Sequence, residues 1–235
     1  MEENNQNQTT NRRGFLGTLA TGAAAMGIAS IASPLKLNAE TNIISGKGVN
    51  PDPDDIFKNL KGKHRVVFDA TRPHDILPFV WPLVFLMTNE GTGTPMKDNN
   101  VVVVLRHDAI PYAFEDKLWV KYKFGELFKA DDPLTKAPSV RNPFWKPKEG
   151  DFKVPGFGNV PIGINELQAN GVIFVVCNAA MTVYTAAVAQ GMSQDAAVVM
   201  KDWKDGLLPG ITIVPSGVWA LGRAQEHGCA YIFAG

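Results

Sequence analysis

The chain has 235 residues, of which 45% are hydrophobic and 20% charged, as expected for a folded globular domain and not for a disordered segment. Lysine plus arginine and aspartate plus glutamate each number 23, so the formal net charge is zero. This balance gives no electrostatic case for binding nucleic acid or an anionic membrane, and we expect neither as a partner.

The first 32 residues resemble a twin-arginine export signal. Arg12-Arg13 precedes Phe15-Leu16 and a Gly/Ala-rich, mildly apolar run that ends near Ala32. Cleavage after Ala32 fits the preference of signal peptidases for small residues just before the cleavage site, and it is favoured over cleavage after Ala39. An uncleaved anchor is disfavoured because the run is short and rich in glycine. The resemblance implies a mature protein that is soluble in a bacterial periplasm or outside the cell.

Residues 33–62 are predicted to form an extended leader with at most a short helical turn around Asp54–Leu60. The main domain is expected over residues 63–235, beginning with a short strand at Arg65–Asp69. A strongly apolar segment follows at Ile76–Thr88, and its prolines leave the start of this element open.

The clearest strand is predicted at Val101–Leu105, whose unbroken apolar character indicates burial on both faces. From Phe114 to Phe128, aromatic, apolar and charged residues alternate at helical spacing. Leu118, Tyr122 and Leu127 are the expected core contacts of this helical stretch.

Residues 130–163 are a Pro- and Gly-rich insertion, longer than most loops in compact domains. A lid, an oligomer contact and a solvated insertion are all compatible with such a segment. Phe144, Trp145, Phe152 and Phe157 favour a contact, because exposed aromatic side chains usually cover something.

A buried strand is predicted at Val172–Val176, and Cys177 stands where it ends. Asn178 is a possible N-cap of an Ala-rich helix that runs from Ala179 to Gln190. Open α/β sheets bind ligands at such strand exits, and the helix dipole there favours a thiolate. The alternative is that Cys177 is a small core residue, as most free cysteines are.

The rest of the chain continues the alternation of helices and strands. Ser193 is expected to cap a helix that ends near Lys204, and Ser216 to cap another at Val218–Glu226. Strands are predicted at Ile211–Val214 and Cys229–Phe233. This alternation predicts an α/β fold with a three-layer, mostly parallel sheet and right-handed crossovers.

The two cysteines are not expected to form a disulfide. Cys177 leaves one predicted strand and Cys229 enters another, so in a parallel sheet they lie at opposite edges. Strands of about five residues span roughly 17 Å, whereas a disulfide requires Cα atoms within about 7 Å.

Four stretches of the chain form a distinctive combination: residues 171–181, 208–211, 214–218 and 224–231. On these stretches, the region from about Arg65 to Gly235 resembles the DsrE/DsrF-like sulfur-relay superfamily. This resemblance implies a flavodoxin-like fold that assembles as a homo-trimer or hexamer. In sulfur-transferring members a cysteine at this strand exit carries a persulfide, and the matching residue is Cys177. The long insertion and the export signal depart from the cytoplasmic members of the superfamily.

The strand exits should gather their polar residues at one edge of the sheet. Near Cys177 we expect basic and hydrogen-bonding side chains that bind an anionic sulfur species: Arg72, His74, Arg106, His107, Asn178 and Ser216. The histidines and cysteines show no metal-ligand spacing, and no phosphate-binding loop or nucleophile elbow is present, so neither a metal nor a cofactor is predicted.

Two functions are therefore open. The first is a thiol-based sulfur carrier or transferase that uses Cys177 and takes a small sulfur species as partner. The second is a non-catalytic, oligomeric module in which a cleft lined by residues 130–163 binds a small ligand or a partner protein.

Overall fold

The computed structural model describes residues 52–235. The predicted export signal and most of the predicted leader lie outside these residues. The short helical turn expected near Asp54–Leu60 is present as α2 (Asp55–Lys58). Within residues 52–235, no helix combines the length and the apolar character that crossing a membrane requires.

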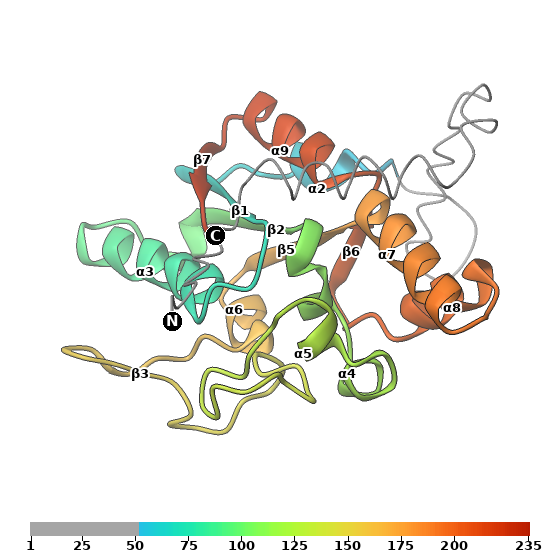
Figure 1. The fold of residues 1–235 in the computed structure, drawn as a ribbon. Coiled ribbons are helices and arrows are strands. Elements are labelled where there is room, and N and C mark those ends of the chain that lie inside the picture. The colour runs from blue at the N-terminus through green and yellow to red at the C-terminus, as the bar shows by residue number, and fades with distance from the viewer. Residues whose placement is uncertain (1–51) are drawn as a thin grey trace, which may run out of the picture. The chain divides into compact units, whose positions relative to one another are not determined.

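A sheet of parallel strands forms the centre of the molecule (Figure 1). Its strand order is β6-β5-β2-β1-β7, and each neighbouring pair is parallel. The unbroken apolar runs of the sequence account for the buried central strands. The five strands are β1 (His64–Ala70), β2 (Asn99–Leu105), β5 (Val172–Cys177), β6 (Ile211–Val214) and β7 (Ala230–Phe233).

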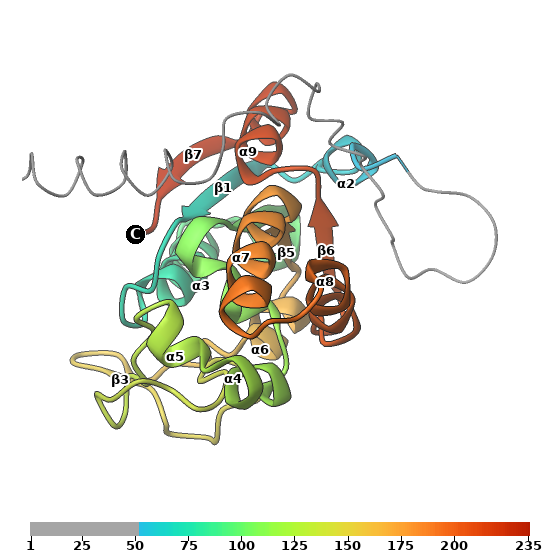
Figure 2. The same ribbon diagram turned by 45° about the vertical axis from the view of Figure 1, so that its right-hand side comes forward.

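Helices cover both faces of this sheet, which confirms the predicted three-layer α/β fold with a flavodoxin-like layout. Alternate side chains of β1, β2 and β5 enter separate hydrophobic clusters, as Phe174 and Val175 of β5 do. In Figure 2, α9 and α2 lie on one side of the sheet and the remaining helices on the other. The helices that cover the sheet include α3 (Leu77–Gly91), α6 (Ile164–Ala169), α7 (Asn178–Gly191), α8 (Ala196–Asp205) and α9 (Gly217–Glu226).

The strand order creates a crevice between the carboxyl ends of β5 and β6. From β1 through β2 and β5 to β6, the chain steps across the sheet in one direction; after β6 it returns to place β7 beside β1. Right-handed crossovers therefore put α7, after β5, and α9, after β6, on opposite faces. Ligands of open α/β sheets bind at such a switch in direction.

The helical stretch predicted from Phe114 to Phe128 is two helices, α4 (Asp116–Tyr122) and α5 (Phe124–Leu127). Lys123 adopts a left-handed conformation with φ of 51°, which ends the first helix. Because the second helix does not continue the turn of the first, Leu127 is 40% exposed. The prediction that Leu127 is a core contact is therefore wrong, whereas Leu118 and Tyr122 are buried. Short 3-10 helices, η2 (Met96–Asp98) and η3 (His107–Ala113), flank β2.

The Pro-rich insertion packs on the core of its own chain. Phe144 and Phe152 are buried, and the Phe144 ring stacks on Phe79 of α3 at a centroid distance of 4.0 Å. Trp145 packs partly against the same cluster, and Phe157 alone of the four aromatic side chains is exposed. The prediction that these aromatics signal a contact with another subunit is thus wrong for Phe144 and Phe152. The insertion also holds a small hairpin, β3 (Lys153–Val154) and β4 (Gly158–Asn159).

Two of the predicted helix caps are shifted. The N-cap of α7 is Cys177 rather than Asn178, and the N-cap of α8 is Asp195 rather than Ser193. In each helix the capping side chain accepts a hydrogen bond from a backbone N–H of the first turn. Ser216 caps α9 as predicted, with its Oγ accepting from the N–H of Trp219 at 3.1 Å.

Candidate functional site

Cys177 lies at the junction between β5 and α7, and its sulfur caps the helix. The Sγ atom accepts a hydrogen bond from the backbone N–H of Ala180 at 3.2 Å. A hydrogen bond to an anionic sulfur is stronger than one to a neutral thiol, and the α7 dipole acts in the same direction. Cys177 is only 6% exposed, so the small accessible surface of the thiol faces a defined environment.

That environment is a cleft of about 380 Å³ between the first turns of α7 and α9. Cys177 and Ala180 form one wall, and Ser216 and Gly217 form the opposite wall. Arg106, which follows β2, lies beside them. The cleft occupies the crevice at which the chain reverses its direction across the sheet, so the N-termini of α7 and α9 both lie beside the Cys177 sulfur.

Arg106 is held in place by a buried carboxylate. Its Nε and Nη2 atoms donate to Asp69 Oδ1 and Oδ2 at 2.6 and 2.9 Å, and the Asp69 side chain is 2% exposed. The Tyr231 hydroxyl, from β7, donates to the same Asp69 Oδ2 at 2.8 Å. The hydrogen bonds that Arg106 donates to Asp69 are the main reason that the pKa of Arg106 is raised, and the negative charge that Cys177 can carry acts in the same direction. The Arg106–Asp69 pair is nearly neutral overall, so the guanidinium brings directed N–H groups more than net charge.

His107 lies at the mouth of the cleft, with a side chain that is 65% exposed. Its Nε2 is 3.8 Å from Asp108 Oδ2, and the Tyr184 hydroxyl of α7 donates to the other oxygen of Asp108. Burial, followed by this hydrogen bond, raises the pKa of Tyr184. The three side chains connect η3 to α7 at the rim of the Cys177 cleft.

The structure brings together some of the predicted site residues and separates others. Arg106, His107 and Ser216 line the same cleft as Cys177. His74 instead lines a separate cavity, and Arg72 is exposed and lines neither of these two cavities. Asn178 begins α7 but does not line the cleft, and its buried Oδ1 has no hydrogen-bond partner within residues 52–235.

Sequence reasoning missed Asp69 and Tyr231, which position Arg106 without lining the cleft. The signal for Asp69 was present, since a carboxylate that ends a buried apolar strand requires a cationic partner. Tyr231 could not be found in this way, because only the pairing of β1 with β7 brings its hydroxyl to Asp69.

Gly217 allows the Arg106 side chain to lie against α9. A Cβ atom at this glycine would be 2.5 Å from Arg106 Cβ and 2.7 Å from Arg106 Cδ. We expect Gly217→Ala to lower the free energy of unfolding by about 2 kcal/mol, the typical cost of overpacking. The matched control is Gly222→Ala in the same helix, where a Cβ would meet nothing within 4 Å. Urea unfolding should show a gain of up to about 1 kcal/mol for that variant; equal effects of the two changes would contradict the close packing of Arg106.

Cys229 is a free thiol in a different environment. It belongs to the hydrophobic cluster on the α9 side of the sheet, whereas Cys177 belongs to the cluster on the opposite side. Burial raises the pKa of Cys229, which keeps this thiol protonated near neutral pH. Within residues 52–235, no three His, Cys, Asp or Glu side chains are grouped so that they could hold a metal ion.

The sequence matches no established protein family and no curated protein. Among solved structures, the fold is similar to that of a protein of unknown function from Methanobacterium thermoautotrophicum. The two chains are 18% identical, and the match covers 73% of this chain and 99% of the other with a TM-score of 0.39.

Proposed function

We propose that this protein is a thiol-based sulfur carrier or transferase of the DsrE-like type, with Cys177 as the sulfur acceptor. The observation that carries the proposal is the position of the Cys177 sulfur. The sulfur lies in the Cys177 cleft and accepts a hydrogen bond from a backbone N–H in the first turn of α7. Cys229, by contrast, is buried in a hydrophobic cluster and has a raised pKa, which makes it a poor nucleophile.

The proposed reaction is an exchange between a thiolate and a polysulfide. After the thiol of Cys177 has lost its proton to solvent, the thiolate attacks the terminal sulfur of a polysulfide dianion. A bond forms between Sγ and that sulfur, the adjacent sulfur–sulfur bond breaks, and its electron pair leaves with the shortened polysulfide. An acceptor thiolate then removes the outer sulfur and regenerates the Cys177 thiolate, so neither step requires an external oxidant or reductant.

The surrounding groups favour the anionic states of this cycle. The N-termini of α7 and α9 supply backbone N–H groups and dipoles that stabilise a persulfide anion. Within residues 52–235, Nη1 of Arg106 has no hydrogen-bond partner, so it is available to donate into the cleft. The Ser216 oxygen accepts from Trp219, which leaves its O–H free to donate to the ligand.

We also propose export and self-association, as the sequence predicts. The twin-arginine pattern at Arg12-Arg13 supports export to the periplasm or outside the cell. Self-association is supported by the edge strand β7, whose Tyr231, Ile232 and Phe233 are 45%, 39% and 55% exposed. A homo-trimer or hexamer remains the predicted assembly.

Sulfur release tests the proposed function. The protein is treated with polysulfide, freed of excess reagent by gel filtration and mixed with cyanide, which removes sulfane sulfur as thiocyanate. Wild type and Cys229→Ser should each release thiocyanate in an amount equimolar with the chain, and Cys177→Ser should release none. Equal release from Cys177→Ser and wild type would rule out Cys177 as the carrier.

A further inference from the structure

A second cavity lies under the start of the Pro-rich insertion. Its volume is about 320 Å³, and its walls come from the turn after β1, from η3 and from the segment after α5. An adjoining cavity of about 340 Å³ shares Asp75, Pro133 and Lys136 with it. Neither cavity is lined by Cys177 or by any other residue of the Cys177 cleft, so this site is separate from the proposed sulfur chemistry.

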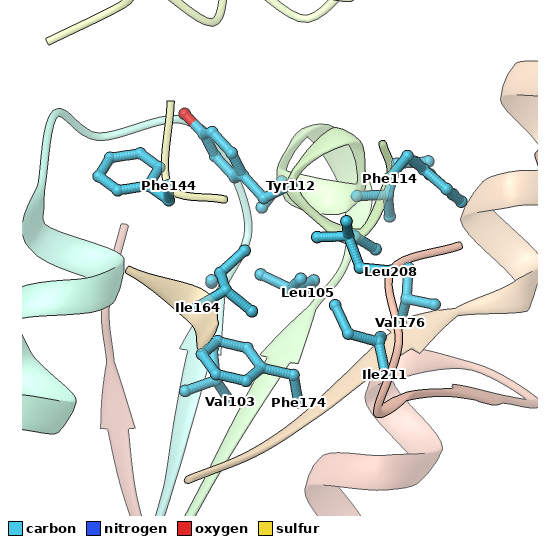
Figure 3. Packing of buried hydrophobic residues seen from close by; sticks show 14 of the residues in the cluster. Val103, Leu105, Tyr112, Phe114, Phe144, Ile164, Phe174, Val176, Leu208 and Ile211 are labelled. Carbon is cyan, nitrogen blue, oxygen red and sulfur yellow. The ribbon is translucent and has the colours of Figure 1, made fainter. Parts of the chain in front are cut away.

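Tyr112 of η3 lines the cavity, and its position is rigid. It is 1% exposed, and its ring packs edge-on against Phe79 and Phe144 at centroid distances of 5.2 and 5.3 Å. Figure 3 shows the hydroxyl oxygen at the end of the ring that points away from the strand residues of the core. This hydroxyl has no hydrogen-bond partner within residues 52–235, and its oxygen is not sealed in the core but is accessible from the cavity that Tyr112 lines.

The hydroxyl remains a hydrogen-bond donor over the whole physiological pH range. Burial raises the pKa of Tyr112, and the negative charges of Asp75 and Asp131 raise it further. In the free protein, water in the cavity can accept from this hydroxyl, and a ligand with an acceptor group can take the place of that water. The phenol therefore points to a ligand with an acceptor group.

The charges around the cavity include both signs. Asp132 is paired with Arg141 at 3.2 Å, and Asp75 with Lys136 at 3.5 Å. Lys129 and Asp131 also line the cavity, and within the described part of the chain neither has an ion-pair partner. A purely anionic or purely cationic ligand would leave one of these two charges unmatched.

We propose that this cavity binds a small zwitterion that carries both an ammonium and a carboxylate group, as a free α-amino acid does. Asp131 receives the ammonium group, Lys129 pairs with the carboxylate, and the Tyr112 hydroxyl donates to a carboxylate oxygen. The adjoining cavity has room for the side chain of the ligand. Such mixed recognition uses the two unpaired charges and the unpaired donor together.

Thermal melting and calorimetry of the mature chain test this proposal. The common α-amino acids are added singly at up to about ten millimolar, where a ligand with a submillimolar dissociation constant raises the melting temperature measurably. At least one should bind, whereas ethylamine and propionate, which carry only one of the two charges, should not. Cys177→Ser should bind that amino acid as wild type does, which separates this result from the fate of the sulfur-carrier proposal.

Tyr112→Phe isolates the hydroxyl. Because the hydroxyl has no partner to lose, the free variant should melt at the wild-type temperature, while its affinity for the bound amino acid should fall about tenfold. The matched control is Tyr122→Phe, whose hydroxyl donates to Asp202 away from the cavity; its affinity should not change. If no amino acid binds wild type, or if Tyr112→Phe and Tyr122→Phe bind equally well, the proposal is overturned. Binding of ethylamine or propionate as tightly as the amino acid would also overturn it.

Discussion

Arg106→Met is expected to lower the free energy of unfolding by about 3 kcal/mol. Asp69 accepts hydrogen bonds from Arg106 and Tyr231, and its side chain is 2% exposed. Removing the guanidinium leaves a buried carboxylate with only the Tyr231 hydroxyl as a partner. Methionine fills much of the volume of the arginine stem, so the loss of stability arises mainly from the unpaired charge of Asp69. Urea unfolding at neutral pH measures it.

The double variant Asp69→Asn/Arg106→Met should be more stable than Arg106→Met, because it no longer buries an unpaired charge. Lys58→Met is the matched surface control, since Lys58 pairs with Asp52 and Asp55 at the exposed surface. This control should lose little measurable stability. A loss at Arg106 no greater than that at Lys58 would mean that the buried pair does not hold the site together.

Phe144→Ala is expected to cost about 3 to 5 kcal/mol, the usual range for a deeply buried phenylalanine. The ring stacks on Phe79 at 4.0 Å and on Phe152 at 5.2 Å. Removing this ring should therefore leave a cavity where the Pro-rich insertion packs against α3. Chemical unfolding should show one cooperative transition at a lower midpoint.

Phe157→Ala is the matched control, because Phe157 lies in the same insertion but is 66% exposed. Its unfolding midpoint should stay close to that of wild type. If Phe144→Ala were as stable as Phe157→Ala, the insertion would have to be detached from the core in solution. The cavity proposed above for a zwitterion would then lose one of its walls.

Much of the fold could be predicted because the strands have strong local signals. Val101–Leu105 and Val172–Val176 are apolar runs that only a strand buried on both faces explains well, and they are strands of the central sheet. The strand–helix junction at Cys177 follows from the same signal. The parallel arrangement then places Arg106, His107 and Ser216 near this thiol, as predicted.

The errors arise where tertiary contacts override local signals. Helical spacing marked Leu127 for the core, but the left-handed Lys123 breaks the helix before it. The side chain of Cys177, not that of Asn178, makes the capping bond of α7, because a thiol is a weak acceptor that N-cap preferences do not favour. The length and the prolines of the insertion predicted a loop. Its aromatic residues pack against residues that are distant in sequence, and the local pattern could not identify these partners.

Intact-mass measurement after brief exposure to polysulfide tests the sulfur-carrier proposal most directly. Wild type and Cys229→Ser should each gain the mass of a single sulfur atom, and dithiothreitol should remove this gain. Cys177→Ser should show no gain under the same conditions. A reducible single-sulfur adduct on Cys177→Ser, or the absence of any adduct on wild type, would contradict the assignment of Cys177 as the sulfur acceptor.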